Sequence, residues 1–85
     1  MQGKELSKVN VNDTIEKNVI TAYKMLHKHS ICHGDVRSAN IIVRDDDSVV
    51  LIDFERGLLN ADKMMLIEEE DEVRHMMRAA RVIHS

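Results

Sequence analysis

Apolar residues recur at helical spacing in the segment between residues 12 and 29. The stripe consists of Ile15, Val19, Ala22, Tyr23 and Leu26, with Ile20 and Met25 beside it. Residues three and four positions apart share one face of a helix, so this stripe predicts an amphipathic helix. Asn12 and Asp13 are suitable N-caps, and the basic side chains near Lys28 suit the negative end of the helix dipole. The pattern therefore predicts a helix over residues 12–29.

The middle of the chain changes to short apolar runs. Ile41–Val43 and Val49–Ile52 are rich in β-branched residues, and the aspartates of Asp45–Ser48 between them favour a turn. Two such runs joined by a short turn predict a β-hairpin, which lies within the segment 31–57 and has polar loops at both ends.

The last part of the chain, residues 60–84, returns to helical periodicity. One side of it carries Leu66, Val73, Met76, Met77, Ala80 and Ile83. Glu70 precedes Arg74 by four residues, a spacing that supports a helix. The pattern does not distinguish one helix from two helices with a break near Glu68–Glu72.

Residues 1–11 are mostly polar, and their periodicity is weak. We expect a loose lead-in there, in which Val9 and Val11 could pair as a short extended piece. The whole pattern predicts an α+β fold in the order helix, β-hairpin, helix, within a single domain over residues 1–85.

Composition narrows the class of protein. The 85 residues are 44% hydrophobic and 32% charged, which is typical of a globular chain, but only 2% are aromatic. The core must therefore be built from aliphatic residues and methionine, which favours a stabilising partner or self-association. The net charge of −3 and the scattered basic residues argue against nucleic acid as a partner.

The single cysteine and the absence of a long apolar run bear on location. Cys32 cannot form an internal disulfide, which favours a reducing compartment. No apolar run approaches the roughly 18 residues of a membrane span, and the first residues do not resemble a signal peptide. We therefore expect a soluble, intracellular (cytoplasmic) protein that does not bind a membrane.

Candidate chemistry lies at the two ends of the predicted hairpin. Asp35 and Asn40 precede its first strand, and Asp53 follows its second. A hairpin returns its second end close to its first, so these three side chains can converge. Two carboxylates and one amide oxygen are hard ligands of the kind that suit Mg²⁺ carrying phosphates. Arg37, between Asp35 and Asn40, could neutralise a phosphoryl group during transfer.

These residues resemble the protein-kinase-like superfamily, which includes protein kinases, fungal kinase-like proteins and aminoglycoside and choline kinases. The segment His33-Gly34-Asp35 with Asn40 is similar to the catalytic loop of that superfamily, and Leu51-Ile52-Asp53-Phe54-Glu55 is similar to its metal-binding turn. The resemblance covers residues 31–57, and the helix at 13–29 stands where the superfamily places the helix before its catalytic loop.

The resemblance implies roles for individual residues. Asp35 would orient or deprotonate the acceptor hydroxyl, with Arg37 placed where protein kinases often keep a lysine that contacts the γ-phosphate. Asn40 and Asp53 would bind Mg²⁺ and, through it, ATP. The remaining two motif residues, His33 and Phe54, would support the loop.

Two departures from the superfamily pattern affect regulation. Gly34 stands in place of the arginine with which regulated protein kinases read a phosphorylated activation loop, so that control is not expected. Glu55 replaces the glycine of the metal-binding turn, as in small-molecule kinases and fungal relatives, and makes a mobile turn less favourable.

The largest departure concerns the nucleotide. The sequence has only three glycines and no glycine-rich loop, and no lysine before the motif lies in an apolar strand context. The resemblance thus implies a truncated kinase-like protein without a nucleotide lobe. The preferred interpretation is a non-catalytic or weakly nucleotide- and Mg²⁺-binding module, working as a homodimer or with a kinase-like partner. Two alternatives stay open: an active ATP-dependent phosphotransferase (kinase) completed by dimerisation or in trans, and an interaction protein that regulates a full-length kinase.

Other polar clusters have simpler interpretations. His27, His29, Cys32 and His33 do not match a zinc-binding spacing, so we expect the first two to be solvated at a helix end and Cys32 to be buried. The acidic run Glu68–Glu72 is expected to be a solvated helix face. The pairs Met64-Met65 and Met76-Met77 are expected to fill a core or an interface.

Overall fold

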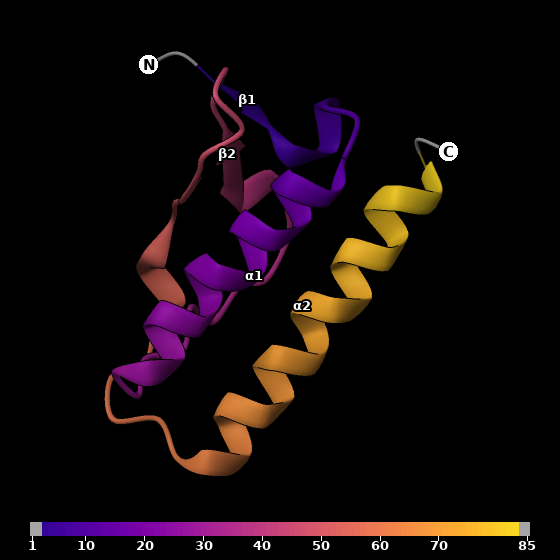
Figure 1. Ribbon diagram of the computed structural model, residues 1–85. Helices are drawn as coiled ribbons and strands as arrows, with labels where there is room; N and C mark the ends of the chain where they lie inside the picture. Colours follow the sequence, from indigo (N-terminus) through magenta and orange to yellow (C-terminus); the bar gives the residue numbers. More distant parts are fainter. Residues whose placement is uncertain (1–2, 84–85) are drawn as a thin grey trace.

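The computed structural model describes residues 3–83, and its longest elements are two helices that lie side by side (Figure 1). The first, α1 (Asp13–Lys28), confirms the helix predicted over residues 12–29. The Asn12 side chain accepts a hydrogen bond from the Ile15 amide at 2.8 Å and so caps the first turn. The chain leaves the helix through Ser30, whose φ of 59° is left-handed.

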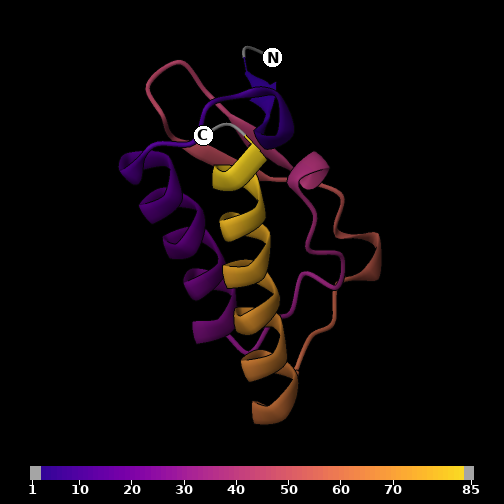
Figure 2. The same cartoon turned by 90° about the vertical axis from the view of Figure 1, so that its right-hand side faces the viewer.

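The second helix, α2 (Lys63–Ile83), is continuous through the acidic run, which settles the question of one helix or two. It runs antiparallel to α1, and the two helices contact each other along their length (Figures 1 and 2). Asp62, just before α2, accepts a hydrogen bond from the Met65 amide at 2.9 Å. Glu70 and Arg74 form the expected pair at 2.8 Å.

A three-stranded antiparallel sheet completes the fold, which is therefore α+β as predicted. Its strands are β1 (Lys4–Glu5), β2 (Ile41–Val43) and β3 (Val49–Leu51), in the order β1-β2-β3. The predicted hairpin is β2–β3, with Ile41 opposite Leu51. In its turn, the Asp46 carboxylate accepts hydrogen bonds from the amide and hydroxyl of Ser48 at 3.0 and 2.6 Å.

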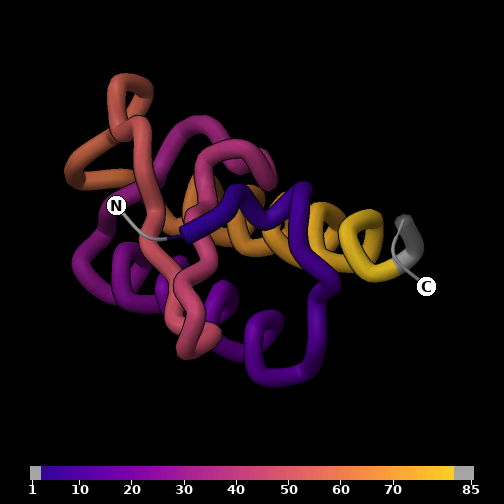
Figure 3. The backbone as a smooth tube through the Cα atoms, turned by 90° about the horizontal axis from the view of Figure 1, so that it is seen from above, coloured from indigo at the N-terminus to yellow at the C-terminus, as the bar shows by residue number. Residues whose placement is uncertain are grey.

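The segment before α1 is not the loose lead-in that the sequence suggested. β1 pairs with β2, as the view from above in Figure 3 shows, and the short 3₁₀ helix η1 (Leu6–Lys8) follows it. Leu6 is fully buried, which ties this segment to the core. Val9 and Val11, the candidates for an extended piece, instead pack half-buried against the core outside any strand.

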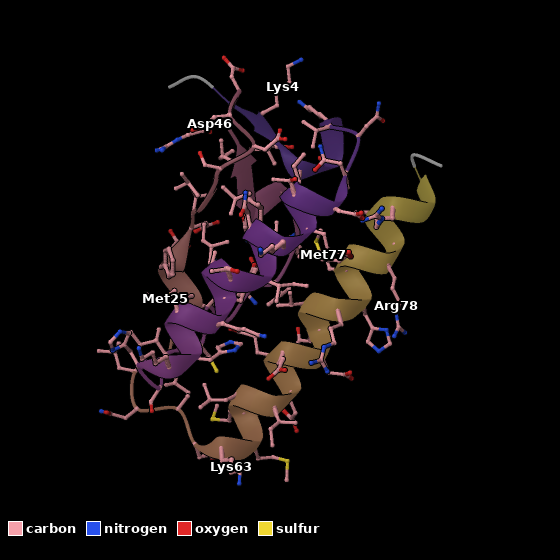
Figure 4. The ribbon with its side chains drawn as sticks, viewed as in Figure 1. Lys4, Met25, Asp46, Lys63, Met77 and Arg78 are labelled. Atoms are coloured by element: carbon pink, nitrogen blue, oxygen red, sulfur yellow. The ribbon has the colours of Figure 1, made fainter. Side chains whose placement is uncertain are left out.

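The core lies between the two helices and the sheet. Its buried members are Leu6, Ile15, Val19, Tyr23, Ile41, Val43, Val73 and Met77. Met77 lies between α1 and α2 in Figure 4, whereas Met64 is 64% exposed, so the methionine pairs only partly fill the core. Val73, Met77 and Ala80 are buried as the apolar stripe predicted, and the side chain of Ile83 falls outside the described residues.

Membrane insertion of a helix has no support in the described part of the chain. Neither α1 nor α2 combines the length and apolar character that crossing a bilayer requires.

Candidate active site

Two hydrogen bonds join the loop before β2 to the segment after β3. The Ile52 amide donates to the Asn40 carbonyl at 2.9 Å, and the His33 ring Nε2 lies 2.7 Å from the Ile52 carbonyl oxygen. His33 Nδ1 accepts from the Asp35 amide at 3.2 Å, so this nitrogen is unprotonated and Nε2 is the one that donates. The fully buried imidazole thus connects the residue that precedes Asp53 to the backbone of Asp35.

The Asp35 carboxylate is held by its neighbours in the loop. The Arg37 guanidinium donates to it at 2.8 Å, and the Asn40 amide nitrogen donates to the Asp35 carbonyl oxygen at 2.9 Å. The hydrogen bond from Arg37 is the main cause that holds the pKa of Asp35 below its usual range; partial burial opposes it, and Asn40 adds to it. Asp35 is therefore an anion at neutral pH.

Asp53 lies at the other end of the hairpin in a left-handed conformation, with φ 63° and ψ 66°. This conformation is uncommon for a residue other than glycine, and such residues concentrate at functional sites. The Asp53 side chain is exposed, and its charge contributes, after that of Asp35, to raising the pKa of Arg37. Phe54 follows in the 3₁₀ helix η3 (Phe54–Arg56), with its ring centroid 4.6 Å from that of His33.

The donor set fits a magnesium ion that arrives with phosphates. Because Asn40 uses its amide nitrogen on the Asp35 carbonyl, its Oδ1 remains for a cation, and Asp53 offers an exposed carboxylate. Between residues 3 and 83, no three His, Cys, Asp or Glu side chains gather as a metal cage. Mg²⁺ usually takes only one or two carboxylates and completes its shell with water and substrate phosphate oxygens.

Glu69 on α2 is the important residue that the sequence analysis missed. It is only 4% exposed, and its two carboxylate oxygens accept hydrogen bonds from the amides of His33 at 2.8 Å and Gly34 at 2.9 Å. His27 Nε2 lies 2.8 Å from the same carboxylate. The loop that carries Asp35 is therefore fastened to α2 by a buried acid.

Two expectations are corrected by this arrangement. The run Glu68–Glu72 is not solvated throughout, because Glu69 points into the protein, and the His27 side chain is only 10% exposed instead of solvated. A signal for Glu69 was present, because it precedes Val73 by four residues and Met77 by eight, on the apolar side of the helix. His29 is exposed as expected.

The structure gives a steric reason why residue 34 is a glycine. Its φ is +87°, and a Cβ atom there would lie 2.0 Å from the Arg56 carbonyl oxygen. No side chain fits at this position without moving the η3 segment. The place where regulated protein kinases carry an arginine is closed in this fold.

Cys32 is buried, as predicted, beside the same loop. Its amide and carbonyl exchange hydrogen bonds with Leu58, both at 3.0 Å. These two bonds form a second backbone connection between the loop that carries Asp35 and the segment after η3. Burial and the charge of Glu69 raise the pKa of the Cys32 thiol, which is therefore protonated at neutral pH.

Comparison with known proteins finds a protein-kinase relative and a matching family. Part of the chain is 45% identical over 42 residues to a serine/threonine-protein kinase D of Synechocystis sp., a stretch that covers 48% of this chain and 8% of the relative. The chain thus spans a small fraction of that relative's length. The model of the lipopolysaccharide kinase (Kdo/WaaP) family matches residues 1–81, and this nearly complete match shows that the chain is kinase-like and belongs to the lipopolysaccharide kinase (Kdo/WaaP) family.

Proposed function

We propose that this chain provides the acceptor-side and magnesium-binding part of an ATP-dependent phosphotransferase, and that alone it binds Mg²⁺ and nucleotide phosphates weakly without turnover. The observation that carries the proposal is the ordered loop around Asp35. Its carboxylate is oriented by Arg37, its backbone is held by His33 and Asn40, and Asp53 lies across the hairpin from it.

Asp35 would orient the attacking hydroxyl. Its lowered pKa makes it a weak base, so it would position the hydroxyl and accept the proton late in the reaction. Arg37 would offset negative charge on the phosphoryl group, and Asn40 and Asp53 would hold Mg²⁺. When bound, that ion would screen the phosphate charges. The support from Phe54 would act through its contact with His33.

The names of both matches indicate the acceptor. Lipopolysaccharide kinases and serine/threonine kinases are named for substrates that offer a hydroxyl group. We propose an alcohol as acceptor, with lipopolysaccharide favoured because the family match covers nearly the whole chain, and an intracellular location where ATP is available.

The nucleotide must be covered by other polypeptide. The sequence contains no glycine-rich loop, and no lysine before Asp35 lies in an apolar run of residues. We propose that these parts come from another segment of a longer product, a second copy of the chain or a kinase-like partner. Exposed apolar side chains near the start of α2, including Leu59, Met64 and Ile67, favour association. Sedimentation at several concentrations tests self-association, and a monomer at every concentration would exclude the homodimer.

Magnesium-dependent stabilisation tests the proposal directly. With a dissociation constant near 1 mM, 10 mM Mg-ATP should stabilise the fold by about 1.4 kcal/mol. Asp53→Asn should remove most of this gain, whereas the matched change Asp45→Asn, in the hairpin turn, should not. If Mg-ATP gives no thermal shift, or if Asp53→Asn keeps the full shift, the magnesium assignment is wrong.

A radiolabel assay tests the claim that the chain alone does not turn over. Phosphate transfer from Mg-ATP to the chain or to added lipopolysaccharide, lost in Asp35→Asn, would show an active kinase instead. That result would favour a site completed within a dimer.

A further inference from the structure

A cavity of about 170 Å³ lies between α1 and α2, apart from the loop that carries Asp35. Its apolar walls are Ile20, Tyr23 and Val73, of which the last two are 1% and 2% exposed. A closed apolar cavity of about 150 Å³ can hold benzene, so this space accommodates a body about the size of one ring.

The lining of the cavity carries one more cationic side chain than carboxylates. Lys24 from α1 and Arg74 from α2 line it together with Glu70. Arg74 pairs with Glu70 at 2.8 Å, whereas Lys24 has no carboxylate within ion-pair distance among the described residues. Glu70 therefore compensates the charge of Arg74, whereas the charge of Lys24 is available to a ligand. An apolar body with one anionic group matches this combination.

The Tyr23 side chain adds a second feature to the same wall. Its hydroxyl is buried, and among the buried side-chain nitrogen and oxygen atoms of the described residues it is the one that lacks a hydrogen-bond partner. Burying an unpaired hydroxyl is unfavourable, so the region between the helices is not fully satisfied by the protein itself.

His27 connects this cavity to the candidate active site. It lines the cavity, and its Nε2 lies 2.8 Å from the Glu69 carboxylate. Glu69 in turn accepts the amides of His33 and Gly34, immediately before Asp35. Two successive hydrogen bonds, from His27 to Glu69 and from Glu69 to the loop amides, therefore connect a molecule that contacts the His27 ring with the backbone before Asp35.

We propose that this cavity binds a small amphipathic anion, such as an aryl or short alkyl carboxylate, and that its occupation is transmitted to the Asp35 loop through His27 and Glu69. The site needs neither nucleotide nor magnesium, so its test does not depend on the proposed phosphotransferase function. A ligand shifts a conformational equilibrium only through contacts that differ between two states. In this proposal the contact with His27 is the one that would change, because His27 is the cavity residue that bonds to Glu69.

Benzoate is the probe, with benzyl alcohol as the neutral ring of similar size and acetate as the anion without a ring. Titration followed by ¹H–¹⁵N NMR should give saturable shifts at Lys24 and Val73, accompanied by shifts of the His33 and Gly34 amides. Benzyl alcohol and acetate should bind more weakly. Benzoate shifts that centre on Arg37 instead, or that do not saturate, would overturn the site.

Charge-removing variants locate the anion. Lys24→Gln should weaken benzoate about two- to fivefold, the range expected for one exposed ion pair. Arg74→Gln should weaken it less, because Glu70 already compensates the Arg74 charge. The controls are Lys17→Gln on α1 and Arg78→Gln on α2; Arg78 projects away from α1 in Figure 4. Equal affinity in the variants and the controls would refute the cationic lining.

The connection through His27 has its own test. His27→Ala should leave the benzoate shift at Val73 and abolish the shifts of the His33 and Gly34 amides. Persistence of those amide shifts would refute the connection. If His27→Ala does not fold, the wild-type titration still decides, because benzoate shifts at Val73 without any at His33 and Gly34 refute the connection equally.

Discussion

Replacing Glu69 is the sharpest test of how the Asp35 loop is held. Glu69→Ala would remove the acceptor of two backbone amides, at 2.8 and 2.9 Å, and the partner of His27, and Glu69 as a residue is only 4% exposed. Leaving a buried donor without its acceptor typically costs about 1–3 kcal/mol, so losing the partner of both amides should cost about 2–6 kcal/mol. At about 0.05–0.15 kcal/mol per residue, a chain of this length has a total stability of only some 4–13 kcal/mol.

Thermal unfolding followed by circular dichroism measures the loss. A cost of 3 kcal/mol corresponds to a fall in Tm of about 12–24 °C for a domain of this size. Glu69→Gln keeps one acceptor oxygen and should lose less. Hydrogen exchange should show faster exchange of the His33 and Gly34 amides in both variants, ahead of amides in the middle of α1.

The neighbouring change Glu68→Ala is the matched control, because Glu68 is exposed on the same turn of α2. It should change Tm by no more than a few degrees, as is usual for surface positions. If Glu69→Ala were as mild as Glu68→Ala, the carboxylate would not be fastening the loop, and the arrangement described for the site would be wrong.

Three further changes test other parts of the structure. Gly34→Ala should cost at least the roughly 1–2 kcal/mol of a left-handed non-glycine residue, plus the contact with Arg56, and should destabilise more than Gly57→Ala in urea unfolding; equal effects would contradict the +87° conformation. Asn12→Ala should lower stability by about 1 kcal/mol through loss of the α1 cap, with exposed Asn10→Ala as control; no difference in urea midpoint between them would argue against the cap. Burial, followed by the charges of Glu69 and Asp35, raises the pKa of Tyr23 in the folded protein, so stability should be complete below the unfolded tyrosine pKa of about 10 and fall as pH rises above it. Tyr23→Phe should lose this alkaline component and be no less stable at pH 7, and an unchanged alkaline profile would show that Tyr23 is not its source.

Periodicity was sufficient for the elements whose amphipathic pattern is regular. The stripe before Lys28, the β-branched runs around the Asp45–Ser48 turn and the stripe that includes Val73 each produced the expected helix or strand. Residues 3–8 were misjudged, because a two-residue strand and a single buried Leu6 carry no periodic signal. Leu6 reaches the core because the strand before it, β1, pairs with β2, about 40 positions away along the chain.

The sequence predicted that the segments of the candidate site come together, but it did not predict what Glu69 does to hold the loop. His33, Asp35, Asn40 and Asp53 follow a motif with fixed spacing, and the hairpin brings their segments together. Glu69 belongs to no such motif, and a carboxylate in an acidic run is ordinarily solvated. Only the position of α2 against the loop shows that this glutamate faces two backbone amides that have no other partner.

The need for Glu69 follows from the irregular backbone of the loop. Residues 33–37 belong to neither helix nor sheet, so the amides of His33, Gly34 and Asp35 must find acceptors outside a ladder. Glu69 accepts the first two and the His33 ring accepts the third. Every one of these acceptors lies within the 85 residues, and none requires a nucleotide lobe. The shape of the loop is therefore a property of this chain, which is why an ordered Asp35 and Arg37 can exist here without the elements that would cover ATP.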